Sequence, residues 1–129
     1  MTPAARVKSA IDILENLMPS AKPADRFLND WARSNRYAGS KDRQAIFELV
    51  YAVLRRRVEF AFLMQADDAR RLVLGALKLD ERLSLEQAEG LFTGGKYSAA
   101  PLDDAERAAY ARAVDETAMP DWVCGNYPQ

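Results

Sequence analysis

The chain has 129 residues, a length typical of one globular domain, and 49% of its residues are hydrophobic. A single cysteine, Cys124, excludes an internal disulfide framework, and the lack of histidine disfavours zinc sites and histidine-based triads. The formal net charge of −1 hides an asymmetry, because residues 1 to 63 carry 11 Lys and Arg against 7 Asp and Glu, whereas residues 64 to 129 carry 7 against 12.

The first predicted element is an amphipathic helix near the N-terminus. Thr2 can cap it, and Pro3 suits its first turn. Its apolar side chains recur at steps of three and four and form one face: Val7, Ala10, Ile11, Leu14, Leu17 and Met18. This stretch lacks the long apolar core of a signal peptide, and no window approaches the roughly 20 apolar residues of a membrane span. We therefore expect a cytoplasmic protein without a membrane partner.

Two further helices are predicted in the first half of the chain. One begins at Pro23 and is followed by a loop that ends at Gly39. The next begins with Ser40 as the expected N-cap, and Asp42 places a carboxylate in its first turn, where it suits the helix dipole. Its apolar stripe is wide enough for a central core helix and comprises Ile46, Phe47, Leu49, Val50, Val53 and Leu54.

The second half also reads as helical. Residues 58 to 65 continue helical or nearly so, and Asp67 or Asp68 caps the next helix. Ser84 with Gln87, and Asp103 with Glu106, have the spacing of capping boxes, and the glycine-rich residues 93 to 101 are expected to form a surface loop. No long stretch alternates with period two. The predicted fold is all-α, with about six or seven helices joined by short loops.

The last residues have a different pattern. The sequence "AMPDWVCGNYPQ" begins a new apolar element at Trp122 and stops a few residues later. We therefore expect one domain over residues 1 to 118 and the start of a linker over residues 119 to 129, and a truncated chain is as plausible as a complete one.

The most distinctive feature is a run of three arginines at the end of the third predicted helix. One interpretation is a solvated helix end, because cations interact favourably with the C-terminal dipole. The other is phosphate binding, because a guanidinium donates two parallel hydrogen bonds to phosphate oxygens. A local positive patch can bind polyanions even on an acidic protein. The candidate RNA-binding residues are Arg33, Arg36, Lys41, Arg43, Arg55, Arg56 and Arg57.

Four other features are considered as possible functional sites. Arg43 lies four residues before Phe47, close to the apolar stripe, so a structural ion pair or a bond to a loop carbonyl is favoured for it. Tyr37, beside Arg36 in a loop, is the one aromatic residue with a plausible base-stacking position. The sequence "TGGKY" lacks the spacing of a phosphate-binding Walker loop. Cys124 has no base or cation nearby to generate a thiolate, so no catalytic role is assigned to it.

The stretch "KDRQAIFELVYAVLRRR" closely resembles a helix of the NusB-like domain at the N-terminus of the RsmB/Sun (Fmu) group of RNA methyltransferases. "ARVKSAIDILENLM" resembles that domain's first helix, "ADRFLNDWARSNRYAGSKDR" its second helix and turn, and "MPDWVCGNYP" its Pro-x-Trp exit element. The likeness covers residues 3 to 65 well and residues 66 to 118 loosely.

The resemblance implies a NusB-like helical bundle that binds or orients ribosomal RNA for a methyltransferase domain in cis. Family members use S-adenosylmethionine to methylate carbon 5 of cytosine, but their catalytic cysteines and cofactor loop belong to a domain that would follow this chain. No catalytic, cofactor-binding or metal-binding residue is therefore carried over to this sequence, and whether to class it as an enzyme stays open. Two alternatives remain: a protein-interaction module that packs on a catalytic domain or partner, and a stand-alone antitermination factor of the NusB type.

Overall fold

The computed structural model describes residues 1–112, and within that range the chain forms seven α-helices and no strand. The all-α prediction with six or seven helices is confirmed. The helices are α1 (Pro3–Leu17), α2 (Ala24–Ser34), α3 (Ser40–Arg55), α4 (Arg57–Met64), α5 (Ala69–Leu79), α6 (Leu85–Glu89) and α7 (Asp104–Arg112). The proposed domain boundary at residue 118 and the interpretations of Trp122 and Cys124 lie outside the described residues.

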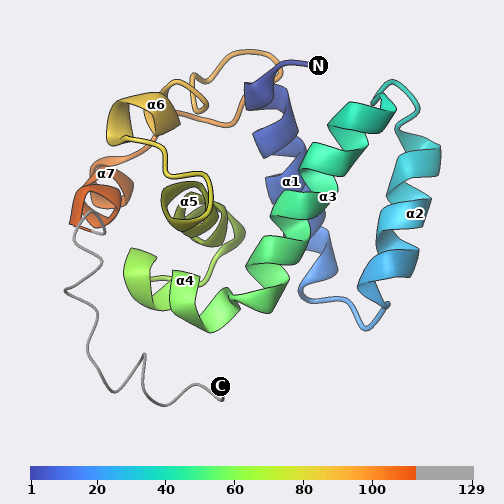
Figure 1. Ribbon diagram of the computed structural model, residues 1–129, viewed down its shortest axis with the longest axis horizontal. Helices are drawn as coiled ribbons and strands as arrows, with labels where there is room; N and C mark the ends of the chain where they lie inside the picture. The colour runs from blue at the N-terminus through green and yellow to red at the C-terminus, as the bar shows by residue number, and fades with distance from the viewer. Residues whose placement is uncertain (113–129) are drawn as a thin grey trace.

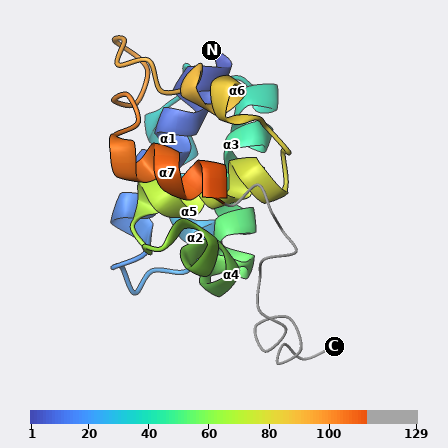
Figure 2. The ribbon, with the colours of Figure 1, turned by 90° about the vertical axis from the view of Figure 1, so that its left-hand side faces the viewer.

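Three helices form the centre of the bundle. α1, α3 and α5 pack against one another, α4 and α7 cover the far side of α5, and α2 lies outside α3 at the opposite edge (Figure 1). A view turned by 90° places α7 across α5, with α4 beside it (Figure 2). α5 is almost wholly buried from Leu72 to Leu77, which makes it the axis of the core.

The fold buries most of the apolar face predicted for α1 and the centre of the one predicted for α3, where Phe47, Leu49 and Leu54 are only partly buried. In α1 the buried side chains include Val7, Ile11 and Leu14, and in α3 they include Ile46, Val50 and Val53. α2 is peripheral by comparison, since Leu28 is its only buried residue. It is held to α3 by an edge-to-face contact of the Trp31 and Phe47 rings, 6.1 Å apart, and by a hydrogen bond from the Tyr51 hydroxyl to Asp25.

Local capping signals account for most helix starts. Thr2 accepts the Ala5 N–H at 3.1 Å, and Asp68 accepts the Arg71 N–H at 3.3 Å. The two predicted capping boxes form as well: Ser84 with Gln87 starts α6, and Asp103 with Glu106 starts α7.

Ser40 is not the N-cap of α3, contrary to the sequence prediction. The cap is Gly39, and Ser40 is the first helical residue. Gly39 has no side chain to cap the helix, but Asp42, the third helical residue, accepts the Gly39 N–H at 3.3 Å, which is one half of a capping box. A carboxylate that reaches back across one turn can therefore start the helix one residue earlier than a local serine would.

α3 and α4 are separate helices because the backbone of Arg56 leaves the helical region, with φ −121° and ψ 31°. The change of direction lets α4 pack closely on α5 (Figure 1). At their crossing a Cβ added to Gly75 would lie 2.7 Å from the Phe60 Cβ, so only glycine fits there. α4 ends at Gln65 in the left-handed conformation, with φ 60°.

Candidate nucleic-acid interface

The seven candidate cations fall into two groups at opposite ends of α3. Arg33, Arg36, Lys41 and Arg43 lie around the α2–α3 turn, whereas Arg55, Arg56 and Arg57 lie where α3 meets α4 (Figure 1). Lys41 and Arg55 are 14 residues apart on one helix, which at 1.5 Å per residue separates them by about 21 Å. The fold therefore presents two basic groups and no single continuous cluster.

Three cations of the first group are solvent-exposed, and we call Arg33, Arg36 and Lys41 the turn cluster. The Arg33 side chain is 79% exposed, and its nearest carboxylate oxygen, on Asp30, is 3.9 Å away. Within residues 1–112, Arg36 and Lys41 form no ion pair and no side-chain hydrogen bond. Their charges are available to an external anion.

Arg43 has the structural role that its position near the apolar stripe favoured. It is half-buried, and its Nη1 donates to the Ala38 carbonyl oxygen at 3.0 Å. Ala38 is fully buried, and its N–H donates to the Asn35 carbonyl oxygen at 3.1 Å. Arg43 thus braces the α2–α3 turn through a bond to its backbone.

The carboxylates nearest the turn cluster are already engaged by cations from elsewhere. Asp42 accepts from Arg6 of α1, whose Nε and Nη2 both lie 2.8 Å from its Oδ1, and that bond holds the pKa of Asp42 below its usual value. Asp30 accepts from Lys22 at 2.7 Å, which likewise lowers the pKa of Asp30. Neither carboxylate is left to neutralise Arg36 or Lys41, so this end of α3 carries a positive local field.

The second group, Arg55 to Arg57, is surrounded by acidic side chains, and we call it the triplet. Arg56 pairs with Asp80 and, at 2.8 Å, with Glu59, and its guanidinium lies 5.0 Å from the centroid of the Phe60 ring. Arg57 is exposed, with Asp67 at 3.9 Å. Arg55 is exposed and borders an open depression whose charged lining also includes Glu48, Asp80 and Glu81. The nearby carboxylates outnumber the three arginines, so the field around the triplet is not positive.

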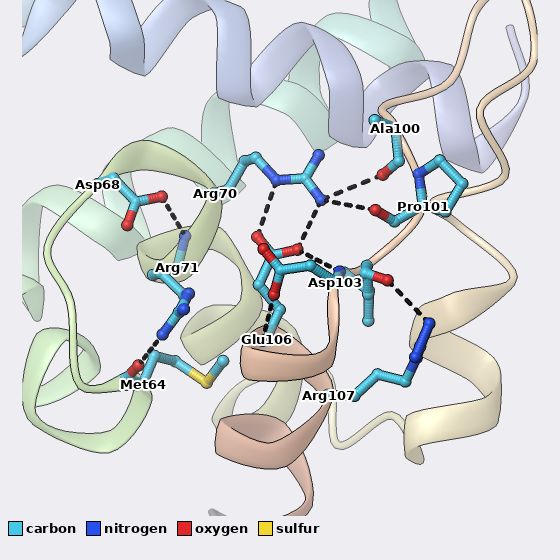
Figure 3. Close-up of polar contacts among 10 residues, drawn as sticks. Met64, Asp68, Arg70, Arg71, Ala100, Pro101, Asp103, Glu106 and Arg107 are labelled. Atoms are coloured by element: carbon cyan, nitrogen blue, oxygen red, sulfur yellow. Dashed lines mark hydrogen bonds and ion pairs between the residues drawn. The ribbon is translucent and has the colours of Figure 1, made fainter.

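A polar cluster that the sequence did not reveal joins α5, α7 and the loop between α6 and α7 (Figure 3). Arg70 forms two parallel bonds of 2.9 Å to Glu106, and its Nη2 also donates to the Ala100 carbonyl at 3.1 Å. Glu106 is 4% exposed and is the only charged residue buried among residues 1–112. Burial alone would raise the pKa of Glu106, but the bonds from Arg70 and from the Asp103 N–H hold that pKa below its usual value.

This cluster is structural. Arg70 stacks 5.1 Å from the Phe92 ring centroid, and the neighbouring Arg71 donates to the carbonyl of Met64 at 2.7 Å, which satisfies the end of α4. The Nε and Nη2 groups of Arg70 both have partners within the fold (Figure 3). The sequence predicts the capping box of Asp103 and Glu106, but it does not predict the bond between Glu106 and Arg70, which lies 36 residues earlier in the chain.

No group of three or more His, Cys, Asp or Glu side chains in residues 1–112 is arranged to hold a metal ion. Over the same range, none of the helices has the length and apolar character needed to cross a membrane.

Comparison with protein-family models, with curated proteins and with solved structures finds no match for this chain. The resemblance to NusB-like domains therefore rests on the sequence stretches quoted above, and the function that it implies stays a prediction.

Proposed function

We propose that this chain is a non-catalytic, NusB-like RNA-binding domain, the N-terminal part of a cytoplasmic ribosomal RNA cytosine-C5 methyltransferase. In this proposal S-adenosylmethionine and the catalytic residues belong to a methyltransferase domain in cis. The observation that carries the RNA-binding role is the turn cluster, in which Arg33, Arg36 and Lys41 are exposed while the carboxylates around them are bound to other cations.

The geometry suits docking on a phosphate backbone. Arginine and lysine side chains on a braced turn can reach several phosphates at once, and each contact releases counterions from the nucleic acid. Such contacts fix the position of the RNA but carry no sequence information. Selection of the target cytosine would therefore come from RNA shape or from the methyltransferase domain.

The test measures binding of the 129-residue chain to a labelled ribosomal RNA hairpin at about 50 mM and about 200 mM salt. In the first variant Arg33, Arg36 and Lys41 are all replaced by glutamine. In a matched control three exposed cations of the second half, Arg82, Lys96 and Arg112, are replaced in the same way. We expect the first variant to bind at least about 10-fold more weakly and the control to bind within about twofold of the parent chain.

The triplet needs separate variants, because replacing all three arginines would also remove the ion pairs of Arg56 with Glu59 and Asp80. Arg55→Gln with Arg57→Gln changes only exposed side chains. A larger loss of RNA affinity in this double variant than in the turn-cluster variant would move the binding site to the other end of α3.

A protein-interaction module is the second candidate, and one observation favours it. Val58 on α4 is 68% exposed, next to the mixed charges of the triplet and of Asp67. Apolar side chains beside paired charges are typical of protein interfaces. If the hairpin does not bind at low salt, or if the parent chain, the turn-cluster variant and the Arg55/Arg57 double variant all bind equally, this second function replaces the first.

A further inference from the structure

Tyr37 is the most exposed large hydrophobic side chain among residues 1–112, at 70% exposure, and it lies inside the turn cluster. Arg36 is its direct neighbour in sequence, and Arg33 and Lys41 are each four residues away. Four residues of extended chain span at most about 14 Å, so the Cα atoms of all three cationic residues lie within about 14 Å of the Tyr37 Cα atom.

The outward position of Tyr37 is fixed by the turn that carries it. The Asn35 side chain donates to the Trp31 carbonyl at 2.8 Å and closes the end of α2. Ala38, the next residue after Tyr37, is fully buried and is bonded to both Asn35 and Arg43. With its neighbour anchored in the protein interior, Tyr37 is held where its ring faces solvent.

A second exposed tyrosine shows what is particular to Tyr37. Tyr97 is 67% exposed and also follows a basic residue, but the Lys96 amine already lies 5.3 Å from the centroid of its ring. In the described residues no aromatic ring and no cation contacts the ring of Tyr37. Within this range the exposed Tyr37 ring therefore has no aromatic or cationic partner that a stacking base would have to displace.

We infer that the α2–α3 turn is a single-strand site, where an unpaired RNA base stacks on Tyr37 while Arg33, Arg36 and Lys41 contact the flanking phosphates. The inference rests on the proposed RNA-binding function and adds the class of RNA. Bases in a duplex are covered by their neighbours on both faces, whereas an unpaired base in a loop or at an end can stack on an aromatic side chain. An exposed ring among exposed cations is the arrangement that this recognition needs.

The experiment compares three labelled RNAs of about 12 nucleotides, within the range bound by single-strand domains. One is single-stranded, one is the same strand in a perfect duplex, and one has abasic riboses in place of all bases, so that phosphates remain and stacking is lost. The proteins are the 129-residue chain and its variants Tyr37→Ala, Tyr37→Phe and, as a matched control, Tyr97→Ala. Thermal melting of each variant confirms that the fold is retained.

We expect the parent chain to bind the single strand about 10-fold more tightly than the abasic strand or the duplex. Tyr37→Ala is expected to remove this preference without changing the affinity for the abasic strand, while Tyr37→Phe and Tyr97→Ala keep it. If Tyr37→Ala binds the single strand as the parent does, the stacking site is wrong and the RNA-binding function stands. A uniform loss for all three RNAs would instead mean that Tyr37 acts through the shape of the turn, which also overturns the inference. Failure of the parent to bind any RNA at low salt would overturn both proposals.

Discussion

Two regions of this molecule, the α2–α3 turn and the contact of α5 with α7, use arginine in different ways. Around the α2–α3 turn, Arg33 and Arg36 extend into solvent, and the nearby Asp30 and Asp42 are bound to other cations. In α5 and α7, Arg70 and Arg107 are bound by carboxylates and by backbone carbonyls of the same fold. An arginine is therefore available to an external anion only when its guanidinium is not already bound within the fold, however many arginines the sequence places nearby.

The largest expected effect is a loss of stability at the Arg70–Glu106 contact between α5 and α7. Glu106→Gln removes the buried charge that Arg70 and the Asp103 N–H bind, so we expect the free energy of unfolding to fall by about 3 kcal/mol. Urea unfolding followed by circular dichroism measures the change. Glu89→Gln is the matched control, because Glu89 is an exposed partner of Arg107 at 3.5 Å and its loss should cost less than about 0.5 kcal/mol. Equal effects of the two changes would contradict the structural role of Glu106.

Acid should reduce the difference in the free energy of unfolding between the parent chain and Glu106→Gln. The pKa of Glu106 is held below its usual value in the folded protein, so its contribution to stability is complete above about pH 4.3, the usual pKa in the unfolded chain. That contribution is lost as the pH falls through the lower pKa of the folded state. Urea unfolding of both proteins at several pH values between 7 and about 3 checks this, and a constant difference would rule it out.

A smaller loss of stability is expected at Arg56. Arg56→Met removes the ion pairs to Glu59 and Asp80 and the guanidinium contact with the Phe60 ring, which should lower the free energy of unfolding by about 1 kcal/mol because the site is partly exposed. Arg55→Met, at an exposed neighbouring position, is the control and should leave the unfolding midpoint unchanged. RNA affinity should be the same for Arg56→Met and the parent, and a specific loss of affinity would place Arg56 in the binding surface.

Arg43 is expected to affect both stability and RNA binding. Arg43→Met should remove the bond to the Ala38 carbonyl, with a loss of about 1 kcal/mol in unfolding free energy. Because that bond braces the turn that carries Tyr37, we also expect RNA affinity to fall about threefold, which binding of the hairpin would measure. A loss as large as that of the turn-cluster variant would show that Arg43 contacts RNA directly.

The smallest effect on stability belongs to the turn cluster itself. Arg33→Gln should leave the unfolding midpoint unchanged, because the Arg33 side chain is 79% exposed and its nearest carboxylate oxygen is 3.9 Å away. The slope of log affinity against log salt should nevertheless become shallower by about 0.7, the value for one phosphate contact on a single strand. An unchanged slope would remove Arg33 from the interface.

Sequence patterns predicted the fold where the signals are local. The apolar faces of α1 and α3 and the caps at Thr2, Ser84 and Asp103 depend on residues three or four apart, and all of them are present in the structure. The exact position of the break, at Arg56, could not be predicted because no glycine or proline marks it. It follows from the packing of α4 on α5, which depends on contacts between residues 15 apart, Phe60 and Gly75.

The candidate site could be predicted only in part, for the same reason. The sequence gives the positions of the seven cations, but whether each is available depends on distant partners. Arg6 engages Asp42 and Asp80 engages Arg56, across 36 and 24 residues of chain respectively. These pairings favour the turn cluster over the triplet, although the three consecutive arginines are the stronger sequence signal.

The close crossing at Gly75 limits how the sequence of this fold can vary. The clash with an added Cβ involves the Cβ and Cα of Phe60, so shortening the side chain at position 60 would not make room for alanine at position 75. Any protein that keeps this arrangement of α4 and α5 should therefore keep glycine at the position of Gly75 wherever the residue opposite has a Cβ. In a search for distant relatives, that single glycine within an otherwise apolar helix would be a more selective marker than the arginine-rich stretch.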